Sequence, residues 1–269
     1  MTRLIRSKFT KKFASLPTVQ SLLRYLVSEF EYLQGIGAGA GIRKSGEIVI
    51  AKQLQHIDGH KTIFDVGANI GGFTEMADSF VFPATFHLFE PQKNLVNDLE
   101  TKYLKDDRKM VNSFALSDAS GEDTLYYDIM GSGLASLSKR NLDHFNISFE
   151  KSESVNVRTV DWYCEQHDIN HIDLLKIDVE GYELNVLKGA KQMISSHSVD
   201  YISFEFGGAN IDTRTYFQDY WYFFEEYGYN IYRILPSSDL SKIDRYREID
   251  EKFRTTNYLA ISPRASASL

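Results

Sequence analysis

The chain has a single cysteine, Cys164. One thiol excludes an internal disulfide and any metal site that is built from a cluster of cysteines. We expect Cys164 to serve as a small, partly buried apolar residue rather than as a nucleophile. A reducing compartment fits this cysteine usage, and we therefore predict a cytoplasmic protein.

The chain also lacks an excess of basic residues and a long apolar run. Its formal charge of −7 disfavours nonspecific nucleic-acid binding, so no nucleic-acid partner is expected. The N-terminus lacks the apolar stretch of a signal peptide or a membrane span. The length of 269 residues suffices for a sizeable core. We expect a basic helical extension over residues 1–45, one main domain over 46–263 and a disordered tail over 264–269.

The N-terminal segment combines positive charge with helical periodicity. No acid precedes Glu29. Apolar side chains recur at helical spacing and predict an amphipathic helix over residues 18–32; they are Leu22, Leu23, Leu26 and Phe30. We expect this helix to pack on the main domain. The alternative is weak peripheral contact with an anionic membrane surface through nearby cations; these are Arg3, Arg6, Lys8, Lys11 and Lys12.

Strand patterns alternate with helix patterns along the rest of the chain. Helices are predicted over residues 45–56, 73–80, 94–104, 160–166, 182–194 and 213–227. Strands are predicted over residues 62–66, 85–89, 110–116, 172–177, 199–206, 229–234 and 258–261. Two further strands, 124–127 and 154–159, are expected to pair as an accessory hairpin. The alternation predicts an open, mostly parallel sheet with helices on both faces, which binds ligands at the carboxyl ends of its strands.

The most informative motif is TIFDVGANIGGFT at residues 62–74. It reads as a buried strand, a glycine turn that brings the backbone close to a ligand, and a helix N-terminus. Asp65 precedes the turn, where a carboxylate repels phosphate and attracts a cation such as the sulfonium group of S-adenosylmethionine. A second glycine-rich stretch, residues 35–41, lacks the Gly-Lys-Ser/Thr of a phosphate loop, and we interpret it as a flexible hinge.

Carboxylates follow three of the predicted strands. Glu90 ends the strand over residues 85–89, and an acid at that place can accept both hydroxyl hydrogens of an adenosine ribose. Asp178 and Glu180 end the strand over residues 172–177, where they can act as a base, bind a metal or orient a substrate hydroxyl. For Glu183 we prefer a role at the N-terminus of the next helix. Glu205 lies in an apolar run and needs a partner or a function.

Four motifs together resemble the FkbM family of S-adenosylmethionine-dependent methyltransferases. They are FDVGANIGGFT, FEP, LLKIDVEGYELNVLKGA and ISFEF, and the resemblance runs from about residue 35 to residue 262. It implies a class I methyltransferase fold: an α/β, Rossmann-like three-layer sandwich whose mostly parallel seven-stranded sheet has an antiparallel last strand. It also implies O-methylation of a sugar hydroxyl or a natural product. Modification of bacterial surface polysaccharides is the commonest setting.

The resemblance also implies roles for individual residues. Asp178 and Glu180 would lie near the transferred methyl group, and Glu47 would close over the methionine end of the cofactor. Phe114 and Ala115 would lie near the adenine. The remaining cofactor-binding residues are Asp65, Gly67, Asn69 and Gly71 in the loop, with Glu90 and Pro91 at the ribose. The variable segments 131–149 and 210–216 are the candidate substrate loops.

For the reaction, we expect Asp178 to accept the acceptor's proton or to orient its hydroxyl, with Glu180 or Glu205 assisting. A divalent metal at Asp178 and Glu180 is a less favoured option, since no histidine joins them in the sequence. Three alternatives stay open. They are a nicotinamide-dependent oxidoreductase, disfavoured because the first turn lacks a full G-x-G-x-x-G, a noncatalytic nucleoside-binding module, and a nucleic-acid methyltransferase.

Overall fold

The computed structural model describes residues 12–41, 45–55 and 57–267. Across these residues, eight strands form the main sheet in the order β10-β9-β11-β8-β7-β1-β2-β3. The neighbours from β8 to β3 pair in parallel, whereas β11 runs antiparallel to both β8 and β9. The strands are β1 (Lys61–Val66), β2 (Ala84–Phe89), β3 (Lys109–Asn112), β7 (Ile172–Ile177), β8 (Val199–Phe206), β9 (Asn230–Ile234), β10 (Leu240–Lys242) and β11 (Thr256–Ile261).

This topology confirms the predicted class I fold. Seven of the strands are those predicted, and β11, the last one, is antiparallel. The short edge strand β10, which pairs antiparallel with β9, was not predicted. The parallel strands place the ends of β1, β2 and β7 at one edge of the sheet, which is where a ligand site is expected.

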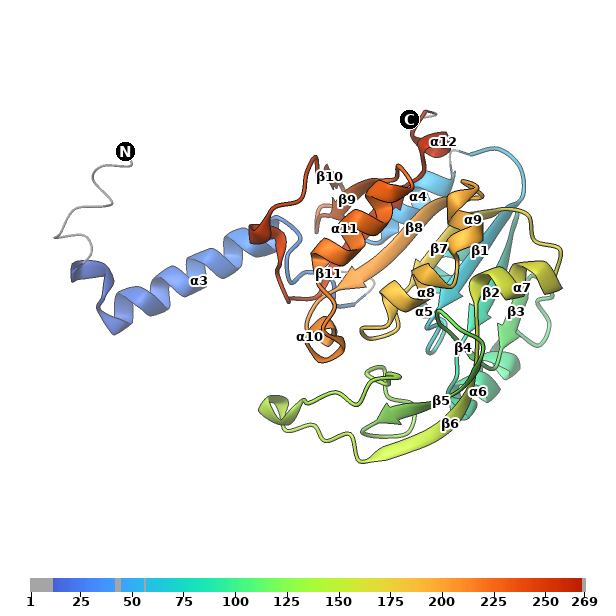
Figure 1. The fold of residues 1–269 in the computed structure, drawn as a ribbon, viewed down its shortest axis with the longest axis horizontal. Coiled ribbons are helices and arrows are strands. Elements are labelled where there is room, and N and C mark those ends of the chain that lie inside the picture. The colour runs from blue at the N-terminus through green and yellow to red at the C-terminus, as the bar shows by residue number, and fades with distance from the viewer. Residues whose placement is uncertain (1–11, 42–44, 56, 268–269) are drawn as a thin grey trace.

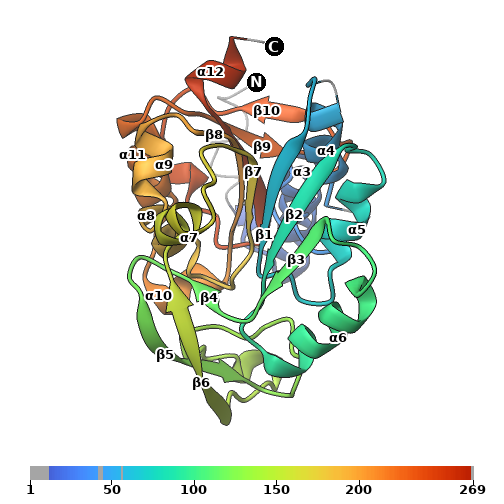
Figure 2. The same cartoon turned by 90° about the vertical axis from the view of Figure 1, so that its right-hand side faces the viewer.

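Helices cover both faces of the sheet and make three layers (Figure 2). One apolar cluster packs α4 (Ile48–Gln55), α5 (Gly72–Asp78) and α6 (Lys93–Tyr103) on one face. The other cluster packs α7 (Val160–Gln166), α8 (Glu183–Lys188), α9 (Lys191–Ser195) and α11 (Phe217–Glu226) on the opposite face. Neighbouring strand residues alternate between the clusters, since Ile63 belongs to the first and Phe64 to the second.

A small accessory sheet lies beyond the carboxyl ends of the parallel strands (Figures 1 and 2). It consists of β4 (Ala115–Leu116), β5 (Gly121–Tyr127) and β6 (Lys151–Arg158), with β5 and β6 paired antiparallel as the predicted hairpin. The strand predicted over residues 110–116 divides into β3 and β4, because β4 leaves the main sheet and pairs with β6. The hairpin and the loop that joins its strands form a wall over the site edge.

The N-terminal helix, α3 (Pro17–Leu33), projects away from the domain (Figure 1). The helix matches the prediction, but the expectation that it packs on the domain is wrong, since none of its residues is buried. Only its C-terminal end contacts the domain, where Glu31 pairs with Lys252 at 2.8 Å and with Arg254 at 2.9 Å. Of the N-terminal cations, only Lys12 lies within the described residues. Among these residues, no helix is long and apolar enough to cross a membrane.

Four further expectations are corrected. Residues 35–41 are no loose hinge, because the Gly39 amide donates to the Thr255 oxygen at 2.9 Å and Ile36 and Ala38 are buried. The helix predicted over residues 182–194 breaks at Gly189, whose backbone touches the chain at Ser117. The helix predicted over residues 213–227 is α11 and begins only at Phe217, and a separate short helix, α10 (Ala209–Thr213), precedes it. Residues 264–266, expected in a disordered tail, belong to α12 (Pro263–Ser266).

Candidate active site at the carboxyl edge of the sheet

A cavity with an empty volume of about 700 Å³ lies between the ends of β1, β2 and β7 and the accessory sheet. Seven of the predicted site residues line it: Gly67, Asn69, Glu90, Pro91, Ala115, Asp178 and Glu180. Five others do not: Glu47, Asp65, Gly71, Phe114 and Glu205. Phe114 packs instead against Phe89 and Trp162.

Glu90 is the buried acid of this cavity, with 3% of its surface exposed. One carboxylate oxygen accepts the amide of Asn69 and the other accepts the amide of Gln92, both at 2.9 Å. Burial raises the pKa of Glu90 to about 7, although the two amides act in the opposite direction. A carboxylate oxygen can accept more than one hydrogen bond. Glu90 can therefore bind two hydroxyl groups while its orientation stays fixed.

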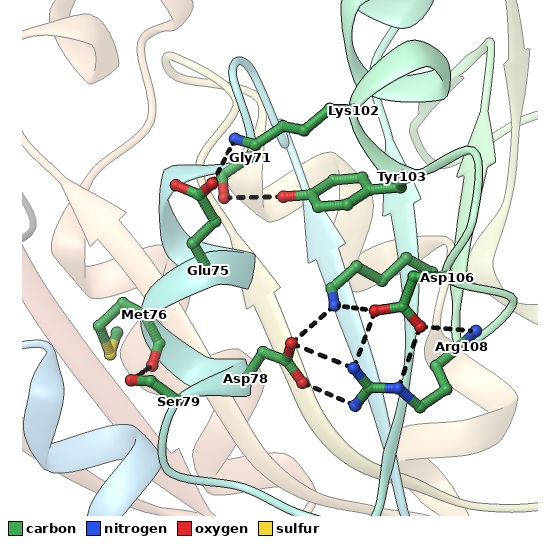
Figure 3. Close-up of polar contacts among 10 residues, drawn as sticks. Gly71, Glu75, Met76, Asp78, Ser79, Lys102, Tyr103, Asp106 and Arg108 are labelled. Atoms are coloured by element: carbon green, nitrogen blue, oxygen red, sulfur yellow. Dashed lines mark hydrogen bonds and ion pairs between the residues drawn. The ribbon is translucent and has the colours of Figure 1, made fainter.

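The loop after β1 brings backbone close to this acid. Gly67 has φ of +79°, and a Cβ there would overlap the backbone oxygen of Asp178. Glycine is required here because the ends of β1 and β7 approach so closely. Gly71 is the N-cap residue of α5 and has the same φ. The hydroxyl of Tyr103 on α6 donates a hydrogen bond to the carbonyl oxygen of Gly71 at 3.4 Å (Figure 3). The loop is thus held by packing outside the cavity.

Polar contacts on the outer side of the domain fix the two helices that carry this loop. Lys102 pairs with Glu75 at 2.8 Å and so joins α6 to α5 (Figure 3). Arg108 binds Asp78 at the end of α5 at 2.7 Å and Asp106 at 2.8 Å. These pairs are remote from the cavity and position the loop rather than take part in chemistry.

Asp65 lies beneath the cavity floor and is fully buried. Its carboxylate accepts the hydroxyl of Thr74 at 2.7 Å and lies 3.4 Å from the ammonium of Lys176. Alternation along β1 directs Asp65 to the same face as Ile63, into the layer of α4 and α5. We expected this acid to attract a bound cation, but in the structure Lys176 and Thr74 occupy its carboxylate.

Lys176 also links Asp65 to the cavity acid Asp178, whose carboxylate lies 3.3 Å from the ammonium. Burial disfavours the charge on Lys176, but the carboxylates of Asp178, Asp65 and Glu47 outweigh it and raise its pKa above the usual value. These distances show that Lys176 pairs with both acids. Lys176 therefore stays protonated and holds the Asp178 carboxylate in place.

A second, smaller cavity adjoins Asp178 on the side of β8 and β11, with an empty volume of about 230 Å³. Its wall is polar and includes Glu47, Ser203, Glu205 and Asn257. Burial, followed by neighbouring carboxylates, raises the pKa of Glu205 well above its usual value. Burial likewise raises the pKa of Glu47, which accepts the hydroxyl of Ser45 at 2.6 Å. Asp178 lines both cavities.

Asp178 and Glu180 differ in their surroundings. The Asp178 side chain is 43% exposed, so it is accessible to a ligand. Glu180 is paired with Arg140 of the predicted substrate loop, and Arg140 also lies 3.5 Å from Asp212 of the other such loop. Burial, then the Asp178 carboxylate, raises the pKa of Glu180 to about 7, although Arg140 acts against this. The two predicted loops thus meet at Arg140, which also pairs with Glu180.

Glu183 has the structural role that we preferred for it. It lies in the first turn of α8, and one carboxylate oxygen accepts the amides of Val179 at 3.1 Å and Gly181 at 3.0 Å. These bonds close the turn that carries Asp178 and Glu180. Burial raises the pKa of Glu183 to about 7.

Sequence reasoning missed several residues of the site. Gln92 binds the loop after β5 twice, through the amide of Gly131 at 3.2 Å and the oxygen of Ser132 at 3.0 Å. Arg140 and Asn257 were missed as well. Arg140 lies within a predicted substrate loop, and that position was its only signal. No sequence signal marks Gln92 or Asn257, because their roles depend on contacts with distant segments.

One cluster in the described residues has the side chains of a metal site: His171, Asp173 and Asp200. It lies at the amino ends of β7 and β8, where Arg264 binds Asp200 at 3.0 Å. Asp178 and Glu180 are not part of it. Cys164 is buried, and burial raises the pKa of its thiol to about 12, so the thiolate that a nucleophile needs does not form near neutral pH.

The family described as Methyltransferase FkbM domain matches residues 65–231. No curated protein matches the chain. Similar solved structures include precorrin-6y C5,15-methyltransferase from Geobacter metallireducens, with 9% identity, a TM-score of 0.41 and coverage of 81% of this chain and 87% of that one.

Two further structures are similar. A putative methyltransferase from Streptococcus mutans in complex with SAH has 8% identity and a TM-score of 0.42, over 79% of this chain and 95% of that one. An rRNA methylase from Streptococcus thermophilus has 10% identity and a TM-score of 0.38, over 81% of this chain and 93% of that one.

Proposed function

This chain belongs to the FkbM family of S-adenosylmethionine-dependent methyltransferases, and from that premise we propose that it methylates a hydroxyl group of a sugar or glycan. The setting that we propose is polysaccharide biosynthesis in the cytoplasm. The observation that carries the proposal is the pair of cavities that meet at Asp178. One cavity has the features of a nucleoside site, and the other is small and polar.

The residues of the larger cavity fit the cofactor. Glu90 has acceptor capacity left on a carboxylate that two backbone amides hold in place, which suits the two ribose hydroxyls. Apolar side chains of Phe89, Leu116 and Leu125 line the same cavity and suit an adenine ring. When bound, S-adenosylmethionine supplies an electrophilic methyl group. We propose Gly67, Asn69, Glu90, Pro91 and Ala115 as its contacts.

The smaller cavity presents polar groups that suit one hydroxyl group of an acceptor. Glu47, Glu205, Ser203 and Asn257 offer hydrogen-bonding groups around a space that also contains Asp178. Because burial and neighbouring charges favour the protonated form of Glu205, this side chain can both donate to and accept from a sugar hydroxyl. Buried polar groups of this kind favour hydroxyl-rich ligands over apolar ones, since an apolar ligand would leave them unpaired.

We assign the proton acceptor to Asp178. Its carboxylate is accessible and is held by the protonated Lys176, whereas the carboxylate of Glu180 is engaged by Arg140. Asp178 would take the proton of the acceptor hydroxyl, or orient that hydroxyl, as the methyl group is transferred. Glu205 would position the acceptor from the opposite wall, and Glu180 would hold the substrate loops.

The test is Asp178→Asn, assayed with radiolabelled S-adenosylmethionine and a sugar or glycan extract. We expect the rate to fall by about 10²–10⁴, the usual contribution of general base catalysis, while the affinity for S-adenosylhomocysteine changes only a few-fold. Asp107→Asn, at an exposed acid remote from both cavities, is the matched control. Normal turnover by a folded Asp178→Asn enzyme would remove the assignment. Full activity in the presence of a chelator would exclude a required divalent metal.

A further inference from the structure

Helix α3 carries an apolar stripe that the described part of the protein leaves uncovered. The stripe follows one side of the helix at intervals of three and four residues, as expected for an amphipathic helix. Phe30 is 62% exposed, and the other members are exposed or partly exposed as well; they are Leu16, Val19, Leu22, Leu23, Leu26, Val27 and Leu33. A run of large apolar side chains on a projecting element marks a binding surface.

The opposite side of α3 accounts for its attachment to the domain. Ser28 accepts a hydrogen bond from Arg254 at 3.3 Å, and Glu31 pairs with Arg254 and Lys252. The contacts lie in the last turns of the helix, and Figure 1 shows the remainder running clear of the sheet. The apolar stripe therefore takes no part in the attachment of α3 to the domain.

The charge of the segment is what identifies the partner. Residues 1–28 contain six cations and no acid: Arg3, Arg6, Lys8, Lys11, Lys12 and Arg24. Glu29 and Glu31 follow, so residues 1–33 carry +4; since the whole chain has a formal charge of −7, residues 34–269 carry −11. Along the sequence, the basic residues precede and overlap the apolar stripe, and the acidic part of the chain follows it.

We propose that residues 1–33 bind an anionic phospholipid surface, with the α3 stripe inserted into the interface and the basic residues against the headgroups. Helices that lie in a membrane interface combine these two features. Each Lys or Arg near an anionic surface adds about fivefold to the affinity. The acidic domain is repelled by the same surface, which favours attachment through the projecting arm alone.

The alternative partner for the apolar stripe is a second copy of this chain. Pairing two stripes in parallel would bring two sets of six cations together, and the residues that flank the stripe do not supply compensating acids before Glu29. Charge complementarity therefore favours the lipid surface. Self-association remains a measurable outcome of the test.

The test is sedimentation of the full chain with vesicles of phosphatidylcholine alone or mixed with phosphatidylglycerol. We expect at least tenfold stronger binding to the anionic vesicles, and loss of most of that difference in 0.5 M salt, because salt screens the headgroups. Leu23→Gln with Leu26→Gln should weaken binding at least tenfold. Thr18→Gln with Ser21→Gln, on the polar side of the same helix, leaves charge and stripe unchanged and should stay within about twofold.

Two results would overturn the proposal. One is absence of binding to anionic vesicles, or equal binding by the stripe variant and the polar-side control. The other is a particle of twice the 30.9 kDa chain mass in light scattering that the stripe variant converts to monomer, with no vesicle binding. Circular dichroism and methyltransferase activity of each variant report whether the protein is folded, since α3 is remote from both cavities.

Discussion

Replacing Glu90 by Gln tests two effects of this buried carboxylate. One is its effect on the pH dependence of stability, and the other is its proposed binding of the cofactor. The pKa of Glu90 rises from 4.5 to about 7 on folding, mainly because the side chain is buried. The folded protein thus binds the proton more tightly than the unfolded chain does. The stability that this proton contributes is complete below pH 4.5 and is lost as the pH rises to about 7. The loss amounts to about 3 kcal/mol, at 1.36 kcal/mol per unit.

The same substitution is expected to weaken binding of the cofactor product. Hydrogen bonds to a charged acceptor contribute about 1.5–3 kcal/mol each, and the amide of Gln has one oxygen where Glu90 has two. Because the two backbone amides of Asn69 and Gln92 face different oxygens, the new NH₂ group must also point at one donor. We expect the affinity for S-adenosylhomocysteine at pH 8 to fall about a hundredfold, or about 3 kcal/mol.

Calorimetric titration and urea unfolding at pH 5.5 and pH 8 measure the two effects. In the natural protein, ligand affinity should rise with pH as Glu90 ionises, and stability of the empty protein should fall. In Glu90→Gln, about 2 kcal/mol of the change in stability between pH 5.5 and pH 8 should be absent, because that is the part of the proton linkage that lies above pH 5.5. The affinity of this variant should also depend less on pH.

Glu183→Gln is the matched control, because Glu183 is a second buried acid whose pKa is raised to about 7. Its amides from Val179 and Gly181 share one oxygen, which Gln retains, and Glu183 does not line the cavity. We expect the same flattening of stability with pH and an affinity within about threefold of normal. An unchanged affinity in Glu90→Gln, or an equal loss in both variants, would refute the reasoning.

Two further predictions concern the loops around the cavity. Gly67→Ala should lower the free energy of unfolding by at least about 2 kcal/mol, because the new Cβ clashes with the neighbouring strand end and the residue has a positive φ. The control is Gly121→Ala, where the new Cβ meets open space and the free energy should change by less than about 0.5 kcal/mol. Urea denaturation measures both values. Arg140→Gln should speed chymotrypsin cleavage of its loop, because it releases Glu180, whereas exposed Lys139→Gln should leave the rate unchanged. Equal effects of the paired variants would contradict either prediction.

The parallel sheet was predictable because its strands bear their own local signals. Apolar runs such as Ile172–Ile177 and Val199–Phe206 are buried from both sides, and their composition shows it without knowledge of the neighbours. The acids at the strand ends could be placed for the same reason, since parallel strands end at one edge. Glu90 and Asp178 accordingly line one cavity.

What the sequence did not reveal depends on contacts between distant segments. Gly189 interrupts a helical stripe because the backbone at Ser117 lies against it, and nothing in the local pattern indicates that contact. Asp65 could have faced either side of the strand end, and the pairing with Lys176 of the adjacent strand becomes visible only in the folded chain. For α3, the periodicity predicted a helix, but periodicity is the same whether a stripe is covered or not.

The loop after β5 is fastened at both ends of the larger cavity. Gln92 binds it beside Glu90, and Ser136 donates to the backbone oxygen of Glu180 at 2.9 Å on the far side. A segment attached at these two points covers one side of the larger cavity. We therefore expect the cofactor product to leave only when both attachments release together.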